Sequence, residues 1–225
     1  MTSQHEKELA VATGVAMVQS GMIVGLGTGS TAELAVKALA ERVKSGLRIQ
    51  GVPTSLRTEK LARDLHIPLT TLDTHPLLDL TLDGADEVDP SLDMIKGGGG
   101  AHFREKVVAR ASRQEIILVD SSKLVKRLGE RFAVPVEVHP FAWRVAATRL
   151  EAMGCVPVLR EAGAEPFKTD NGNVILDCKF PGIDDAAALE KELDHIVGVL
   201  ANGIFVGLAT AVIVGEGETV RSLTR

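Results

Sequence analysis

The chain has 225 residues, enough for one large domain or two small ones with a buried core. Its formal charge of -5 gives no reason to expect nucleic acid as a partner, because nucleic-acid-binding proteins favour a basic face. Aromatic residues make up only 3% of the chain and tyrosine is absent, which argues against recognition of stacked bases.

The first part of the chain alternates helices with short apolar strands. Apolar residues at helical spacing predict a helix over 6–19, and Met22–Leu26 follows as a buried strand. The glycine-rich segment 25–31 then turns into a helix that ends near Val43. Further helices are predicted over 59–65 and 104–112, and further strands over 49–52, 69–72, 77–82 and 115–120. Such alternation indicates βαβ units around a mostly parallel sheet.

From about Val134 the order of elements changes to β-α-β-β-α-β. This order is typical of a ferredoxin-like α+β domain. Its predicted strands are 135–138, 156–160, 174–179 and 196–200, and its helices are 143–153 and 185–195. Two more strands, 204–206 and 211–214, are expected to return to the first sheet. We therefore predict a doubly wound, Rossmann-like α/β domain (1–133 with 204–225) that carries the chemistry and contains an inserted ferredoxin-like domain (134–203).

The segment Gly25-Leu-Gly-Thr-Gly-Ser-Thr31 lies where a strand turns into a helix. Backbone N–H groups and the helix dipole favour an anion at such a turn, although a purely structural tight turn is the alternative. It is not a P-loop, because no Gly-Lys-Ser/Thr follows. Nor is it a dinucleotide fingerprint, because Ser30 replaces the third glycine. A mononucleotide or sugar phosphate fits this turn better.

The acidic segment Asp83-Gly-Ala-Asp86-Glu87 follows a predicted strand, at the end where open α/β sheets bind ligands. Its carboxylates could accept hydrogen bonds from sugar hydroxyls or relay protons between oxygens. Two alternatives stay open: an acidic turn in solvent, and a site for a divalent metal, whose preferred ligands are carboxylates.

Lys96 precedes four consecutive glycines, and Glu105 falls near the start of the next helix. Glycine tolerates sharp bends and close approach to a ligand, so this backbone can present N–H groups to a developing oxyanion. Glu105 suits a general base, or an acid that only complements the helix dipole. Lys123 and Lys7 could reach the same edge of the sheet, or lie on the surface.

Taken together, these segments resemble ribose-5-phosphate isomerase of the A type. The matching motifs occur in family order over essentially the whole chain: Gly25–Thr31, Asp83–Glu87, Met94–Ala101, Arg104–Lys106, Asp120–Lys123 and Thr169–Asp177. The resemblance implies interconversion of D-ribose 5-phosphate and D-ribulose 5-phosphate in the non-oxidative pentose phosphate pathway, without metal or organic cofactor. It also implies a homodimer or homotetramer.

The resemblance places the catalytic base on Glu105. As further catalytic residues we expect Lys96, which can stabilise the developing oxyanion, and Asp83 or Asp86, which can shuttle a proton between O1 and O2 and assist ring opening. The resemblance places substrate binding on Thr28, Gly29, Ser30, Thr31, Asp83, Gly84, Ala85, Asp86, Lys96, Gly97, Gly98, Gly99, Lys123 and, by a looser match, Lys7. We expect proton transfer through a cis-enediolate. Three rivals remain: a non-catalytic sugar-phosphate sensor, a deaminase of amino-sugar phosphates and a metal-dependent hydride-shift isomerase.

Two cysteines without metal-binding spacing predict reduced thiols in a cytosolic protein. The polar N-terminus is unlike a signal peptide, and no apolar run approaches the ~18 residues of a membrane span. We therefore expect a cytoplasmic protein that binds a small sugar phosphate and neither nucleic acid nor membrane.

Overall fold

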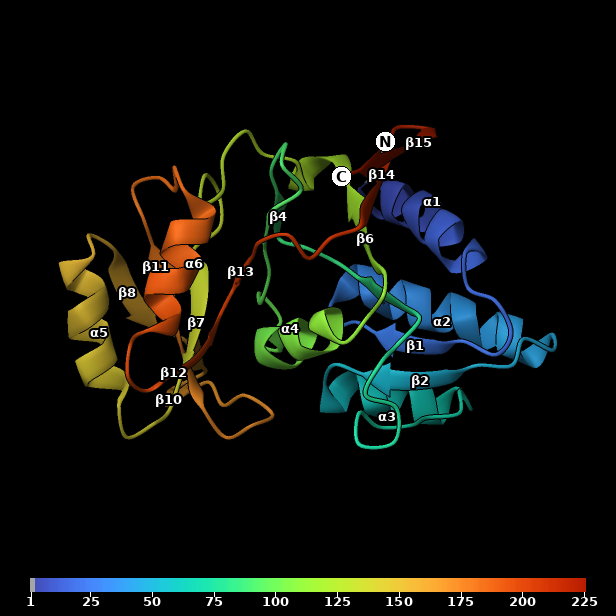
Figure 1. The fold of residues 1–225 in the computed structure, drawn as a ribbon, viewed down its shortest axis with the longest axis horizontal. Coiled ribbons are helices and arrows are strands. Elements are labelled where there is room, and N and C mark those ends of the chain that lie inside the picture. The colour runs from blue at the N-terminus through green and yellow to red at the C-terminus, as the bar shows by residue number, and fades with distance from the viewer. Residues whose placement is uncertain (1–2) are drawn as a thin grey trace. The chain divides into compact units, whose positions relative to one another are not determined.

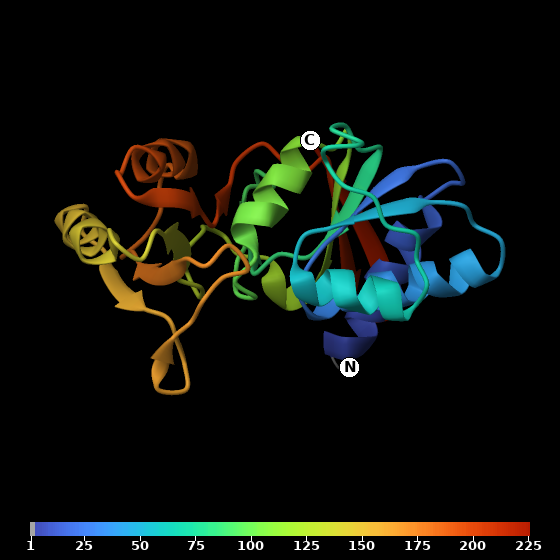
Figure 2. The same ribbon diagram turned by 90° about the horizontal axis from the view of Figure 1, so that it is seen from below.

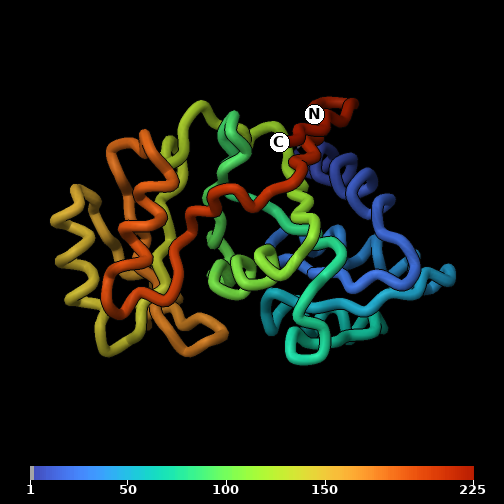
Figure 3. The backbone as a smooth tube through the Cα atoms, in the orientation of Figure 1, coloured from blue at the N-terminus to red at the C-terminus, as the bar shows by residue number. Residues whose placement is uncertain are grey.

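In the computed structural model, which describes residues 3–225, contacts divide the chain into two compact units. The first unit contains 1–85, 104–123 and 207–225, and the second contains 86–103 and 124–206. The chain thus passes between the units four times, a course that can be followed along the tube in Figure 3. This division puts 86–103, 124–133 and 204–206 in the second unit, whereas the predicted domains divide the chain at 133/134 and 203/204.

The first unit is built on a six-stranded sheet with the order β15-β14-β6-β3-β1-β2. Neighbouring strands are parallel except β15, which runs antiparallel to β14. The strands are β1 (Ile23–Leu26), β2 (Gln50–Pro53), β3 (Leu80–Asp83), β6 (Glu115–Asp120), β14 (Ala211–Glu216) and β15 (Thr219–Thr224). The predicted doubly wound, mostly parallel sheet is confirmed.

Helices cover both faces of this sheet. On one face, α1 (Ser3–Ala16) and α2 (Ser30–Lys44) lie side by side (Figure 1), and α3 (Leu56–Asp64) lies beside α2 (Figure 2). Alternate strand residues such as Val24 and Leu26 join their core. The opposite face meets α4 (His102–Arg110), whose Val108 packs with Val52 and Leu78. The sheet is thus buried on both sides, and its strand ends are left for other contacts.

The second unit has a four-stranded antiparallel sheet with the order β12-β7-β11-β8. Along the chain, β7 (Val134–Val138), α5 (Trp143–Ala152), β8 (Val156–Leu159), β11 (Val174–Lys179), α6 (Ala186–Asp194) and β12 (Val199–Asn202) form the predicted βαββαβ arrangement. A hairpin, β9 (Glu161–Ala162) with β10 (Glu165–Pro166), is inserted after β8. Among residues 3–225, no helix is long and apolar enough to cross a membrane.

Two predicted strands differ in formation or pairing, and several predicted bounds are shifted: the strand predicted over 77–82 begins at Leu80, and the helix predicted over 6–19 is Ser3–Ala16. Residues 69–72 form no strand, since only Leu69 makes an isolated bridge to Gly51. The predicted strand 204–206 does not return to the first sheet: β13 (Ile204–Phe205) pairs with β5 (Met94–Ile95), which pairs with β4 (Glu87–Val88). The last strand of the βαββαβ segment begins at Val199, three residues later than predicted, because the chain after α6 turns at 195–198 first.

Candidate active site

The glycine-rich turn after β1 and Asp83 at the end of β3 meet at the point where the strand order reverses. From β1 the chain continues to β2 on one side, whereas β3 is followed by β6 on the other. Ligands of open α/β sheets bind outside the carboxyl ends of the strands at such a switch point. The Gly27 N–H donates to the Leu82 carbonyl at 3.0 Å, and the Thr28 N–H donates to Asp83 Oδ1 at 3.2 Å.

Asp83 has no solvent exposure, and its Oδ1 also accepts the Gly84 N–H at 2.7 Å. A Cβ added to Gly27 would lie 2.2 Å from that oxygen, so only glycine allows this approach. The Asp83 carboxylate therefore fixes the turn after β1, while Gly84 and Ala85 beside it stay partly exposed.

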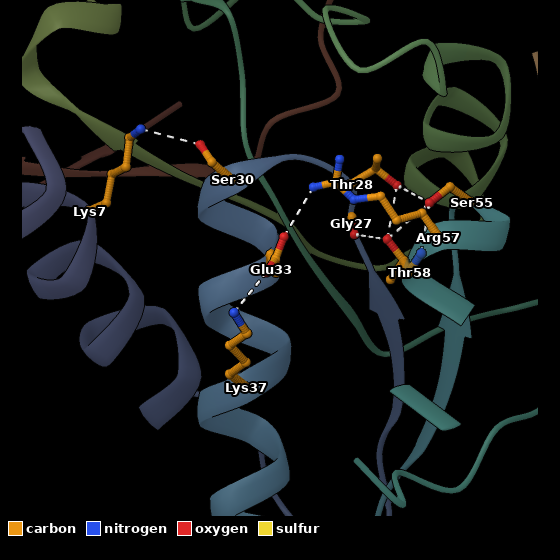
Figure 4. Close-up of polar contacts among 9 residues, drawn as sticks. All are labelled: Lys7, Gly27, Thr28, Ser30, Glu33, Lys37, Ser55, Arg57 and Thr58. Atoms are coloured by element: carbon orange, nitrogen blue, oxygen red, sulfur yellow. Dashed lines mark hydrogen bonds and ion pairs between the residues drawn. The ribbon is translucent and has the colours of Figure 1, made fainter. Parts of the chain in front are cut away.

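The Thr28 hydroxyl forms hydrogen bonds with other hydroxyl groups beneath the turn (Figure 4). It lies 2.8 Å from Ser55 Oγ, and Thr58 Oγ1 donates to the Gly27 carbonyl at 2.9 Å. The Thr28 hydroxyl also lies 2.7 Å from Thr54 Oγ1. Ser55 is also the N-cap of α3, accepting the Thr58 N–H. Sequence reasoning missed these three hydroxyl residues, although the run Thr54-Ser55 before a helix is a capping signal. Thr28 is thus a support of the turn through its side chain.

Lys7 approaches the start of α2, as Figure 4 shows. Its Nζ lies 3.2 Å from Ser30 Oγ and 3.9 Å from Asp120 Oδ2. Gly29 is the N-cap of α2, has a φ of 115° and supplies no capping side chain, so the first N–H groups of α2 face an open position. A helix N-terminus, a hydroxyl and an ammonium together favour a phosphate. Thr31 is nearly buried in the first turn of α2.

Lys123 ends the 3₁₀ helix η1 (Ser121–Lys123), which directly follows β6. β6 neighbours β3 in the sheet, so η1 leaves from the same edge as Asp83. The Lys123 side chain is partly exposed. The first unit therefore brings Thr28–Thr31, Asp83 and Lys7 together, with Lys123 at the same edge.

The glycine turn after Lys96 belongs to the second unit. Lys96 is 2% exposed, and its ammonium lies 5.5 Å from the centroid of the Phe205 ring. Gly97 and Gly100 have φ values of 108° and 76°, in the left-handed region that favours glycine. The Gly98 N–H donates to Asp86 Oδ2 at 2.8 Å. Of the N–H groups expected to face an oxyanion, that of Gly98 is thus bound to Asp86.

Glu105 lies in the first turn of α4 and is 3% exposed. Within the second unit, a Cβ added to Gly97 would lie 2.8 Å from Nδ1 of the buried His102. Within residues 3–225, no group of three or more His, Cys, Asp or Glu side chains is arranged to hold a metal ion.

Comparisons with known proteins agree over nearly the whole chain. The ribose 5-phosphate isomerase A (phosphoriboisomerase A) family matches residues 50–219. The chain is 50% identical to ribose-5-phosphate isomerase A of Chloroflexus aurantiacus, with 99% of this chain and 95% of the relative covered. It is 49% identical to the Thermomicrobium roseum protein of the same name, covering 100% and 96%.

Two solved structures of closely similar fold are also ribose 5-phosphate isomerases. Ribose 5-phosphate isomerase A of Methanocaldococcus jannaschii is 43% identical, with a TM-score of 0.95 and 100% of both chains covered. A D-ribose-5-phosphate isomerase in complex with phospho-erythronic acid is 41% identical, with a TM-score of 0.97 and the same full coverage. Sequence and fold agree from end to end, and the chain belongs to the ribose 5-phosphate isomerase A family.

Proposed function

We propose that this chain interconverts D-ribose 5-phosphate and D-ribulose 5-phosphate by proton transfer through a cis-enediolate. The observation that carries the proposal is Lys7 beside Ser30 at the open N-terminus of α2, next to the switch point of the sheet. The phospho-erythronic acid bound to a relative supports it, because that acid combines a phosphate with a carboxylate whose two oxygens resemble those of an enediolate.

The phosphate of the substrate binds at the N-terminus of α2. The N–H groups after Gly29 and the hydroxyls of Ser30 and Thr31 donate to it, while the ammonium groups of Lys7 and Lys123 offset its charge. Binding energy from this phosphate, remote from the reacting carbons, positions the sugar for the chemical step.

Glu105 is the base. It removes the C2 proton of the open-chain aldose, and the electron pair moves through the new C1–C2 double bond onto the carbonyl oxygen. A proton then passes from O2 to O1, and return of a proton from Glu105 to C1 gives the ketose with its carbonyl at C2, so the reaction is balanced without a metal or redox partner. The buried Lys96 ammonium stabilises the negative oxygen, an effect worth about 10²–10³ in rate for one such donor.

The two aspartates have different tasks. Asp83 is fully buried and held by two N–H groups, which suits a support of the turn after β1. Asp86 is partly exposed, which suits proton relay between O1 and O2 and opening of the furanose ring. Since Asp83 and Asp86 are only three residues apart, their Cα atoms are at most about 11 Å apart, and both are assigned to one substrate.

The decisive experiment follows the metal-stripped protein with ribose 5-phosphate in D₂O by proton NMR. We expect ribulose 5-phosphate with solvent deuterium at C1, and the variant Glu105→Gln to lose about 10²–10⁴ of kcat while still binding substrate. Ketose without deuterium would favour a hydride shift or a shielded proton. A folded wild-type protein that forms no ketose would refute the proposal, and full turnover in Glu105→Gln would remove that residue from the base role.

We also propose a cytoplasmic homodimer or homotetramer. Cys155 and Cys178 are buried free thiols, as in proteins of reducing compartments. The second unit exposes Phe141, Val145 and Val197 by 94%, 73% and 90%, and such side chains are typical of contacts between subunits. Light scattering after size-exclusion chromatography gives the mass directly, and a monomer would contradict this proposal.

A further inference from the structure

The glycine turn of the second unit is held by an arginine outside the predicted site. Arg160, between β8 and β9, donates from Nη1 to the Gly97 carbonyl at 2.9 Å and to the Gly98 carbonyl at 3.3 Å. The rest of its guanidinium is taken by Asp177 of β11: Nε to Oδ2 at 2.9 Å and Nη2 to Oδ1 at 2.5 Å. Arg160 thus joins β11 to the backbone of the turn.

The Arg160 side chain is held by contacts with both Asp177 and Phe167. The Arg160–Asp177 pair is a two-pronged contact, which fixes the plane of the guanidinium as well as its position. Phe167 donates its N–H to the Arg160 carbonyl, and its ring lies 5.9 Å from the guanidinium. The same ring lies under Gly100, where an added Cβ would come within 2.5 Å of it. Arg160 is 15% exposed in its side chain, so little water competes for these contacts.

The geometry of the peptide bond carries the effect of Arg160 across the turn. In a planar trans peptide, the C=O and the next N–H point in opposite directions. The Gly97 carbonyl points to Arg160, so the Gly98 N–H points away from it, and there it meets Asp86 Oδ2 at 2.8 Å. By the same rule, the Gly98 carbonyl at Arg160 turns the Gly99 N–H away from the guanidinium.

We propose that Arg160, fixed by Asp177, is a positioning residue for the isomerisation. It holds the Gly97–Gly98 peptide, and thereby the orientation of the Asp86 carboxylate, and it holds the Gly98–Gly99 peptide, and thereby the orientation of the Gly99 N–H. This inference rests on the proposed function, which assigns Asp86 to proton relay. Without the guanidinium, the Gly98 carbonyl loses this donor and the Gly97 carbonyl keeps the Gly100 N–H at 3.0 Å. The two peptides are then held less tightly, and the Asp86 carboxylate loses its fixed geometry at the Gly98 N–H. Substrate binding at the phosphate end uses α2 and Lys7 and does not depend on this peptide.

The test compares Arg160→Lys, Arg160→Ala and Asp177→Asn with Arg127→Gln. Arg127 is the matched control, because it also pairs with an aspartate of the second unit, Asp184, but lies exposed. Lysine keeps the charge of Arg160 but cannot hold a carboxylate and two carbonyls at once. We expect kcat for ribose 5-phosphate to fall by up to about 10²-fold in Arg160→Lys, since small misplacement of a reacting group can cost that much. KM should change little, and Asp177→Asn should lose less.

A second readout separates positioning from loss of structure. Methylguanidinium added to Arg160→Ala should restore part of its kcat and none of that of Glu105→Gln, whereas a variant that is merely unstable would not respond. If Arg160→Ala does not fold, Arg160→Lys and Asp177→Asn decide the matter by kcat, KM and thermal unfolding. Full kcat in these folded variants, or a rise in KM with kcat unchanged, would overturn the inference. A wild-type chain that forms no ribulose 5-phosphate would instead refute the proposed function itself.

Discussion

Lys7 and Lys123 approach the phosphate position from different elements, and both should act on substrate binding. Lys7 comes from α1 and is held between Ser30 and Asp120, while Lys123 comes from η1. Charge-assisted hydrogen bonds contribute about 1.5–3 kcal/mol each, so Lys7→Ala or Lys123→Ala should raise KM for ribose 5-phosphate by about 10- to 100-fold. The chemical step is remote from the phosphate, so kcat should fall less.

Steady-state kinetics at fixed ionic strength measures this effect. Lys37→Ala is the control, because Lys37 lies on the exposed side of α2 and pairs with Glu33 (Figure 4). An unchanged KM in either test variant would remove that lysine from the phosphate site, and an equal change in Lys37→Ala would indicate a nonspecific effect of charge.

The positions of single residues could be predicted from the sequence where they lie at the end of a predicted strand or the start of a predicted helix. Asp83 ends one strand and Thr28 follows another, and parallel strand ends share one edge, so their contact could be expected. The inward turn of the Thr28 hydroxyl and the contact of Arg160 with Gly97 could not. Both depend on side chains that are far apart in sequence and are brought together only by tertiary packing.

Among the elements, β1 is packed so closely that it requires a glycine at position 25. A Cβ at Gly25 would lie 1.9 Å from Thr81 Oγ1 of β3 and 2.7 Å from Val108 Cγ1 of α4. Gly25→Ala should therefore push β3 or α4 away and lower the free energy of unfolding by about 1–3 kcal/mol, the usual range for overpacking. Urea unfolding measures this loss.

Gly21→Ala is the matched control, since no atom lies within 4 Å of its added Cβ and only its φ of 96° opposes the change. We expect a loss of about 1 kcal/mol there, from backbone strain alone. If Gly25→Ala were no less stable than Gly21→Ala, the close packing of β1, β3 and α4 would be wrong.

Elements were predictable in proportion to their length and periodicity. β6 occupies the predicted residues 115–120, since the four consecutive apolar residues 116–119, between polar residues and turns, are typical of a buried strand. Leu69 pairs only once because the chain passes the sheet edge at that point and continues as a loop. The two-residue strands β4 and β5 have too little pattern to be seen. The strand at 204–206 is predicted, but nothing in its sequence indicates that β13 pairs with β5 and not with the first sheet.

For the whole molecule, the order of elements predicted both kinds of sheet but not how the chain is shared between the units. Residues 86–103 join the second unit because β5 pairs with β13, more than a hundred residues later. Glu87 adds to this, since its carboxylate accepts the N–H groups of Gly129, Arg131 and Phe132. No local pattern near Glu87 indicates these distant partners.

The first unit is also closed by one side chain that joins three distant parts of the chain. Glu6 of α1 accepts the Gly217 N–H at the β14–β15 turn at 3.0 Å, and the Ser121 Oγ and N–H after β6 at 2.8 and 3.1 Å. The hydrogen bond from the Gly217 backbone, followed by those from Ser121, holds the pKa of Glu6 below its ordinary value. All these donors favour the charged carboxylate over the protonated acid.

Because the pKa of Glu6 is lowered in the folded state, the contribution of Glu6 to folding stability decreases as the pH falls. Its stabilisation is fully present above the ordinary glutamate pKa of about 4.3 and is lost as the pH falls through the lower folded value. Glu6→Gln should therefore lower the unfolding temperature at pH 7, and its difference from the wild type should shrink as the pH falls below 4. Glu8→Gln, on the exposed side of α1, should show neither effect. Thermal unfolding at pH 7, 5, 4 and 3 measures both variants. If the difference between Glu6→Gln and the wild type stayed constant with pH, the charge of Glu6 would not be what stabilises these contacts. Hydrogen bonding that does not depend on charge would then account for them.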